Sequence, residues 1–143
     1  MTPQTRAERS ADAMWANDRA SRALGMTLIH IAPGAATLTM TVRDDMLNGH
    51  GLCHGGYIFT LADSAFAFAC NSYNQSAVAQ NNQITYVAPG KAGEMLTATA
   101  MEIHAAGRSG TYDVTVTGDM NRTIALFRGH SRTIPGTHFE EDA

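Results

Sequence analysis

Apolar and polar residues alternate with a period of two in several parts of the chain. In the segment 36–42, apolar residues occupy every second position and threonine fills the three positions between them. This alternation is typical of a strand with one buried face, and β-branched residues favour it further. Pro33 and Gly34 predict a tight turn before it, so residues 26–31 are expected to form the preceding strand. Four more strands are predicted, at roughly 77–87, 94–104, 111–118 and 123–133.

Two helices are predicted by different patterns. Thr2 and Pro3 are typical of an N-cap followed by a proline in the first turn, and Gly25 is typical of a helix stop. The apolar residues between them form a loose stripe, which predicts an amphipathic helix over 3–24. In the segment 55–73, apolar residues occur on all sides, which predicts a helix buried on most of its surface.

The order of these elements is one helix, two strands, a buried helix and four strands. Strands joined by short turns are expected to be antiparallel neighbours, and a curved sheet can bury a central helix. The sequence therefore predicts an α+β protein in which an antiparallel β-sheet wraps around one long central helix, with an extra N-terminal helix. This architecture is called the hotdog fold. With 143 residues, we expect a single domain over 1–143, with a core at 26–134 and a flexible tail at 135–143.

Composition excludes several classes of protein. Hydrophobic residues make up 44% and charged residues 16% of the chain, which is typical of a globular protein. The net charge of -3 excludes a strongly basic nucleic-acid-binding surface, and two cysteines exclude a disulfide framework. The first 22 residues lack the apolar segment of a signal peptide, and the longest apolar stretch, 57–70, is too short to cross a bilayer. We therefore expect a cytoplasmic protein with no membrane or nucleic-acid partner.

The segment 48–65 carries the strongest indication of chemistry. Gly55 and Gly56 open the predicted central helix, although glycine disfavours a helix by about 1 kcal/mol relative to alanine. The first amides of a helix have no internal partner and lie at the positive end of its dipole, so they can bind a carbonyl oxygen that becomes negative. A steric explanation stays open here, because two glycines also allow a helix to pack closely on a sheet.

Asp63 lies within an otherwise almost wholly apolar helix. A buried carboxylate is unfavourable unless it is paired or hydrogen-bonded. No Lys or Arg occurs between His54 and Gly90 to pair with it locally. Asp63 is therefore a candidate general base or nucleophile in a cavity. The alternative is a structural carboxylate, held by backbone amides or by a distant arginine: Arg108, Arg122 or Arg128.

The spacing of Gly55 and Asp63 limits how they can act together. They are eight residues apart, which corresponds to about 12 Å along a helix. A reacting carbonyl must lie roughly 3 Å from its donor and within reach of the base, so one copy of the helix cannot supply both. If both act on one substrate, they must come from two subunits related by a two-fold axis, with antiparallel helices.

Two other sets of reactive side chains are weaker candidates. His50, Cys53 and His54 form a candidate metal cluster, but neither a fourth ligand nor a Cys-x-x-Cys motif accompanies them. Cys53 is also a candidate nucleophile, although Asp63 is the better explanation of the segment. No metal is expected.

The pattern Asn48-(x5)-His54-Gly55-Gly56-(x6)-Asp63 resembles the signature of hotdog-fold acyl-CoA thioesterases of the phenylacetate-degradation (PaaI) family. The resemblance implies that the Gly55 amide polarises the thioester carbonyl and that Gly56 allows close approach. It implies that Asp63 of the partner subunit attacks the carbonyl or activates a water. It also implies that His54 hydrogen-bonds near the thioester and that Asn48 holds the substrate or the water.

The resemblance extends over roughly residues 24–133, with one departure. Relatives can carry a short polar side chain at the position that is Ala79 here, and an alanine cannot orient a water. Asn81 or a backbone group is therefore expected to take that role, unless the role is absent from this chain. Arg108 is expected to contact a phosphate of coenzyme A, and Arg128 is a second candidate.

The family implies hydrolysis of acyl-CoA thioesters to the free acid and CoA, with phenylacetyl-CoA or a ring-hydroxylated derivative as substrate in phenylacetate catabolism. It implies no metal or redox cofactor and a homotetramer built as a dimer of dimers. Two other functions stay open at this point. A hotdog acyl-thioester dehydratase or hydratase would need a histidine working with a carboxylate, and a non-catalytic acyl-CoA binding module would need no buried acid.

Overall fold

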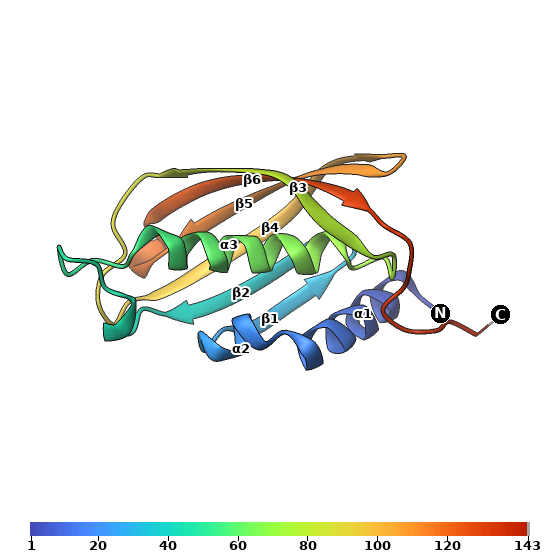
Figure 1. The fold of residues 1–143 in the computed structure, drawn as a ribbon, viewed down its shortest axis with the longest axis horizontal. Coiled ribbons are helices and arrows are strands. Elements are labelled where there is room, and N and C mark those ends of the chain that lie inside the picture. The colour runs from blue at the N-terminus through green and yellow to red at the C-terminus, as the bar shows by residue number, and fades with distance from the viewer. Residues whose placement is uncertain (143) are drawn as a thin grey trace.

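The computed structural model describes residues 1–142, in which one antiparallel sheet of six strands curves around a long helix (Figure 1). The strand order is β1-β2-β4-β5-β6-β3, so β1 and β3 form the two edges. The predicted fold class is confirmed. The strands are β1 (Thr27–Ala32), β2 (Ala35–Thr41), β3 (Ala77–Tyr86), β4 (Met95–Ala106), β5 (Ser109–Thr117) and β6 (Thr123–Thr133).

The central helix, α3 (Gly55–Cys70), lies across the concave face of the sheet, as expected. It ends three residues earlier than predicted, because Asn71 caps it. The side facing the sheet is fully buried and includes Leu61, Ala65 and Phe66. A stripe at helical spacing on another side is only half-buried: Thr60, Asp63 and Ala67. The sheet of one chain therefore leaves part of α3 uncovered.

The N-terminal region forms two helices instead of the single helix predicted over 3–24. They are α1 (Pro3–Asn17) and α2 (Arg19–Ala23), and the chain leaves helical geometry at Asp18, with φ -85° and ψ 86°. Asp18 Oδ1 accepts a hydrogen bond of 2.9 Å from the Ser21 amide, which caps α2. The break results from this capping, which competes with continuation of the helix.

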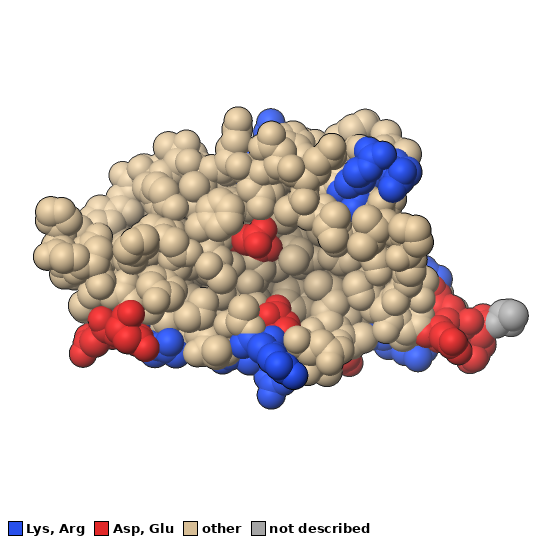
Figure 2. All heavy atoms as spheres, in the orientation of Figure 1, with Lys and Arg blue, Asp and Glu red and all other residues tan. Residues whose placement is uncertain are grey.

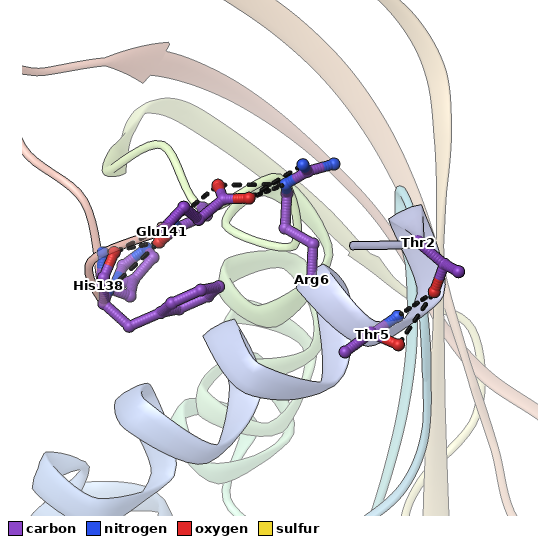
Figure 3. Close-up of polar contacts among 7 residues, drawn as sticks. Thr2, Thr5, Arg6, His138 and Glu141 are labelled. Carbon is purple, nitrogen blue, oxygen red and sulfur yellow. Dashed lines mark hydrogen bonds and ion pairs between the residues drawn. The ribbon is translucent and has the colours of Figure 1, made fainter. Parts of the chain in front are cut away.

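The C-terminal tail, expected to be flexible, has specific contacts on α1 and on the turn that follows α3 (Figure 3). Arg6 forms an ion pair of 2.8 Å with Glu141, and Thr2 caps the start of α1 by accepting from the Thr5 amide. Asn74, in the left-handed region with φ 57°, accepts a hydrogen bond from the amide of His138. The polar composition of the tail did not indicate these anchors.

No helix in residues 1–142 is long and apolar enough to cross a membrane.

Candidate active site

The start of α3 presents a free backbone donor. His54 is the N-cap, in an extended conformation with φ -61° and ψ 133°, and its Nδ1 accepts a hydrogen bond of 3.0 Å from the Gly56 amide. The Gly55 amide has no acceptor in residues 1–142. Because Nδ1 of His54 is an acceptor, the neutral ring carries its hydrogen on Nε2, which is a second possible donor. The site thus has one unused amide at the positive end of a long helix.

Gly55 is also required by packing against Tyr86, at the end of β3. The Tyr86 hydroxyl donates a hydrogen bond of 2.9 Å to the Gly55 carbonyl. A Cβ added to Gly55 would lie 2.9 Å from Cζ of that ring, closer than side chains normally approach. The steric explanation for Gly55 is therefore correct, and it is compatible with a binding role because the amide stays free.

A groove of about 370 Å³ opens beside this amide. Asn48, Gly55 and Tyr86 contribute its polar groups, and its apolar residues include Ile58 and Pro89. Oδ1 of Asn48 accepts hydrogen bonds from two amides of its own loop, those of His50 and Leu52. Its Nδ2 makes no hydrogen bond within the described chain, so this donor is available to a ligand in the groove.

The carboxylate of Asp63 lies half-buried on α3, and its hydrogen-bond partner is a side chain of β3. Asn82 Nδ2 donates to Asp63 Oδ1 at 3.0 Å. Burial raises the pKa of the Asp63 carboxyl above its ordinary value, and the hydrogen bond from Asn82 lowers it by a smaller amount. No cation of residues 1–142 lies within ion-pair distance of Asp63. Half-burial, a raised pKa and the lack of a nearby cation are together typical of a catalytic carboxylate.

The distant arginines considered as partners of Asp63 are all engaged elsewhere. Arg122 pairs with buried Glu94 at 2.9 Å, and Arg128 pairs with Asp113 at 2.6 Å. Arg108 donates to the carbonyl of Thr133. The structural alternative for Asp63 as an ion-paired carboxylate is therefore wrong.

Asn82, and not the expected Asn81, lies beside Asp63. A β-bulge at Gln80 interrupts the pairing of β3 with β6 between Ala79 and Asn81. After the bulge the register is regular: Asn81 pairs with His130 on the outer face of the sheet, and Asn82 pairs with Gly129 on the inner face. Sequence reasoning missed Asn82, although counting back by twos from Ile84 places it on the inner face.

The two arginines expected to bind coenzyme A lie away from the start of α3. Arg128 is on the outer face of the sheet, where Asp113 already neutralises it, so it is not a free cation. Arg108 is exposed in the β4–β5 turn, near the other end of α3, and has no carboxylate partner within the described chain. Ala79 lies on the exposed edge strand and offers only a methyl group.

The weaker candidates of the sequence have ordinary environments. Cys53 is buried, and burial raises the pKa of its thiol, which disfavours the nucleophilic thiolate. His50 is exposed in the loop, while His54 is occupied as a helix cap. No three His, Cys, Asp or Glu side chains come together as a metal site anywhere in residues 1–142.

Comparison with known proteins gives matches over most of the chain. The model of the thioesterase superfamily matches residues 50–125. The acyl-coenzyme A thioesterase PaaI of Escherichia coli (strain K12) is 48% identical over 132 residues, which cover 92% of this chain and 94% of that protein. The solved structure of the E. coli PaaI protein from the phenylacetic acid degradation operon superposes with a TM-score of 0.93 at 46% identity, covering 95% of this chain and 99% of that one. A Streptococcus mutans protein bound to acetyl CoA superposes with a TM-score of 0.75 at 28% identity, covering 78% and 90% of the two chains.

Proposed function

The chain belongs to the thioesterase superfamily and, within it, to the PaaI family of hotdog-fold acyl-CoA thioesterases, and we propose that it hydrolyses acyl-CoA thioesters in a site built by two copies. One observation carries the proposal: a free amide at the start of α3 and a half-buried carboxylate without a cation occur on the same helix. Acyl transfer to water needs a donor for the developing oxyanion and a base or nucleophile. These two groups meet those needs.

In this mechanism the amide of Gly55 donates to the thioester carbonyl oxygen, and the helix dipole stabilises the charge that develops there. Nδ2 of Asn48 and Nε2 of His54 are further donors for the substrate. Asp63 acts as nucleophile or general base, and the raised pKa makes it a stronger base than an exposed aspartate. The carbon–sulfur bond then breaks, and the CoA thiol and the free acid leave.

A homodimer would complete the site, because Gly55 and Asp63 are about 12 Å apart along α3. Three features support a partner beside β3. This edge strand has ten residues with no proline and no charge, so its free edge can pair with another strand. The stripe of α3 that includes Asp63 is only half-buried. Charged side chains lie mainly along the borders of the face shown in Figure 2, which suits contact with a neutral surface. The dimer of dimers expected for the family remains part of the proposal.

We assign an aromatic acyl-CoA as substrate, with phenylacetyl-CoA or a ring-hydroxylated derivative first. The relative from the E. coli phenylacetic acid degradation operon supports this choice. The acetyl CoA bound to the S. mutans protein supports a CoA ester. Arg108 is the cation proposed to contact a CoA phosphate, since no carboxylate neutralises it within the described chain. We propose that the enzyme needs no metal or redox cofactor. We also propose that it is cytoplasmic.

The geometry favours hydrolysis over the dehydratase reaction. A dehydratase needs a histidine working with a carboxylate, whereas the partner of Asp63 in this chain is the amide of Asn82 and His54 caps α3. Loss or gain of the conjugated absorbance of an enoyl-CoA would nevertheless detect such an activity directly.

The test is thiol release from phenylacetyl-CoA, 4-hydroxybenzoyl-CoA and hexanoyl-CoA by the wild type and by Asp63→Ala. We expect hydrolysis of an aromatic ester by the wild type and a loss of at least roughly 10²-fold in the variant, typical of a positioned acid–base group. Tight binding of CoA esters without turnover would instead support a binding module. Equal rates in the two proteins would make Asp63 structural.

A further inference from the structure

The pair formed by Asp63 and Asn82 joins the central helix to the edge strand. Gly129 makes this approach possible, because it faces Asn82 across the sheet and has no side chain. A Cβ on Gly129 would lie 2.7 Å from the ring of Phe66, one turn after Asp63 on α3. The helix therefore packs directly on β6, close enough to the sheet for the side chain of Asp63 to contact β3.

The two polar ends of the Asn82 amide have different environments. Its nitrogen donates to Asp63 Oδ1 at 3.0 Å, which fixes the orientation of the amide, since its oxygen would repel the carboxylate. Its Oδ1 is buried and has no hydrogen-bond partner in the described chain. Buried polar groups are normally hydrogen-bonded, so an unpartnered acceptor beside a carboxylate indicates a place for a donor. Asp63 Oδ2 makes no hydrogen bond in the described chain either.

We propose that Asn82 is the residue that positions the hydrolytic water: its amide nitrogen donates a hydrogen bond to Asp63, and its amide oxygen accepts a hydrogen bond from one O–H of the water while Asp63 accepts a hydrogen bond from the other. The inference rests on the proposed thioesterase function and selects the general-base route for Asp63. As the water oxygen bonds to the thioester carbon, its proton passes to the Asp63 carboxylate. The carbon–sulfur bond then breaks, and the CoA sulfur takes that proton.

The two residues of β3 that the sequence suggested for this role, Ala79 and Asn81, do not fit it. Ala79 has only a methyl group, and Asn81 lies on the outer face with His130. Asn82 is the polar residue of this strand whose side chain bonds to Asp63. Cys70, also on α3, is a titratable group whose pKa the charge of Asp63 raises further. Burial raises the pKa of its thiol to about 12, so it stays protonated over the working pH range.

Two substitutions separate the two functions of the amide. Asn82→Leu removes donor and acceptor at similar size, while Asn82→Asp keeps an acceptor, loses the donor and adds a like charge. For Asn82→Leu we expect kcat to fall by roughly 10- to 10²-fold with KM unchanged, and the acid limb of kcat/KM to move to higher pH, because the hydrogen bond that favours ionised Asp63 is lost. For Asn82→Asp we expect the acid limb of kcat/KM to move further to higher pH, because the new carboxylate repels the charge of Asp63. At pH values above this limb, kcat should be higher than in Asn82→Leu, because an acceptor for the water is kept. Gln83→Leu, on the outer face next to Arg128, is the matched control.

A measurement that needs no turnover keeps this inference separate from the proposed function. The ¹³C shift of the Asp63 carboxyl, assigned with Asp63→Asn, reports its titration directly. We expect Asn82→Leu to raise the pKa of Asp63 and Gln83→Leu to leave it unchanged. An unchanged titration in Asn82→Leu, or a wild-type kcat and acid limb in that variant, would overturn the inference even if the wild type is an active thioesterase. If the wild type hydrolyses no thioester while the titration shifts as expected, the proposed function and the positioning of water by Asn82 are both wrong. Only the hydrogen bond from Asn82 to Asp63 is then supported.

Discussion

Tyr86 donates a hydrogen bond of 2.9 Å to the carbonyl oxygen of Gly55, and its ring lies where a side chain of Gly55 would begin. Tyr86, at the end of β3, thus fixes the position of Gly55, the first residue of α3, by contacts with the carbonyl oxygen and the Cα of Gly55. The amide on the opposite side of the same residue remains free. The contact that explains the glycine therefore also orients the proposed oxyanion donor.

Replacing Gly55 by proline tests this donor against a matched control. Both Gly55→Pro and Gly55→Ala add a Cβ that collides with the Tyr86 ring, but only proline removes the amide hydrogen. Proline suits the first position of a helix, and His54, with φ -61° and ψ 133°, already has the conformation preferred before a proline. We expect Gly55→Pro to lose roughly 10²- to 10³-fold in kcat beyond Gly55→Ala. Equal losses in the thiol-release assay would show that the amide is not used.

Gly129 is predicted to set the distance between α3 and the sheet. Gly129→Ala would force its Cβ to within 2.7 Å of the Phe66 ring, and overpacking of this kind destabilises a core by about 1 to 3 kcal/mol. We also expect a lower kcat, because a displaced α3 loses the contact of Asp63 with Asn82. Urea unfolding and thiol release measure the two effects.

Two comparisons serve as controls for Gly129→Ala. Gly49→Ala adds a methyl group with nothing within 4 Å, so it should leave stability unchanged. The double variant Gly129→Ala/Phe66→Leu, with a smaller side chain facing the new methyl group, should be less destabilised than the sum of its two single variants. Additive effects would contradict the predicted collision.

The buried carboxylate of Glu94 is predicted to make stability depend on pH. Glu94 is 4% exposed and accepts hydrogen bonds from the amides of Lys91 and Asp119 and from Arg122. Burial raises the pKa of Glu94, but these hydrogen bonds lower it by more, so its pKa lies below the ordinary 4.5. The contribution of ionised Glu94 to the free energy of unfolding is therefore fully present above about pH 4.5, and it is lost as the pH falls through the lowered pKa.

Substitution of either partner should reveal this contribution. We expect Arg122→Ala to lower the free energy of unfolding at pH 7 by about 1 to 3 kcal/mol, since it leaves a buried acceptor short of a partner. Glu94→Gln should be less stable than the wild type at pH 7, and the difference should shrink as the pH falls below 4.5. Urea unfolding of the three proteins at several pH values is the measurement. A constant difference between Glu94→Gln and the wild type would contradict the assignment.

Local patterns predicted most of the fold. Alternation with a period of two located the strands to within a few residues, most clearly where one face is buried against α3, as in β2 and β5. The helix break at Asp18 was not predicted, since a single capping side chain decides it. The docking of the tail depends on Asn74 and Arg6, which lie far away in the sequence.

The candidate site was only partly accessible to the sequence. Glycines at a helix start and an acid within an apolar helix are local signals, and they led to Gly55 and Asp63. The partner of Asp63 is Asn82, which lies 19 residues further along the chain on another element, so no local pattern links the two residues. The pairing of Arg128 with Asp113 is a cross-strand contact between residues 15 positions apart, so the sequence alone did not reveal it.

The central claim is that Gly55 of one copy and Asp63 of another act on the same thioester, and co-expression of Gly55→Pro with Asp63→Asn tests it most directly. Each variant alone should be nearly inactive with phenylacetyl-CoA. In a mixed dimer, one site combines both substitutions and the other has neither, so a statistical mixture should recover activity at about one quarter of its sites. If each site lies within one copy, every site carries one substitution, and the mixture would stay as inactive as the separate variants.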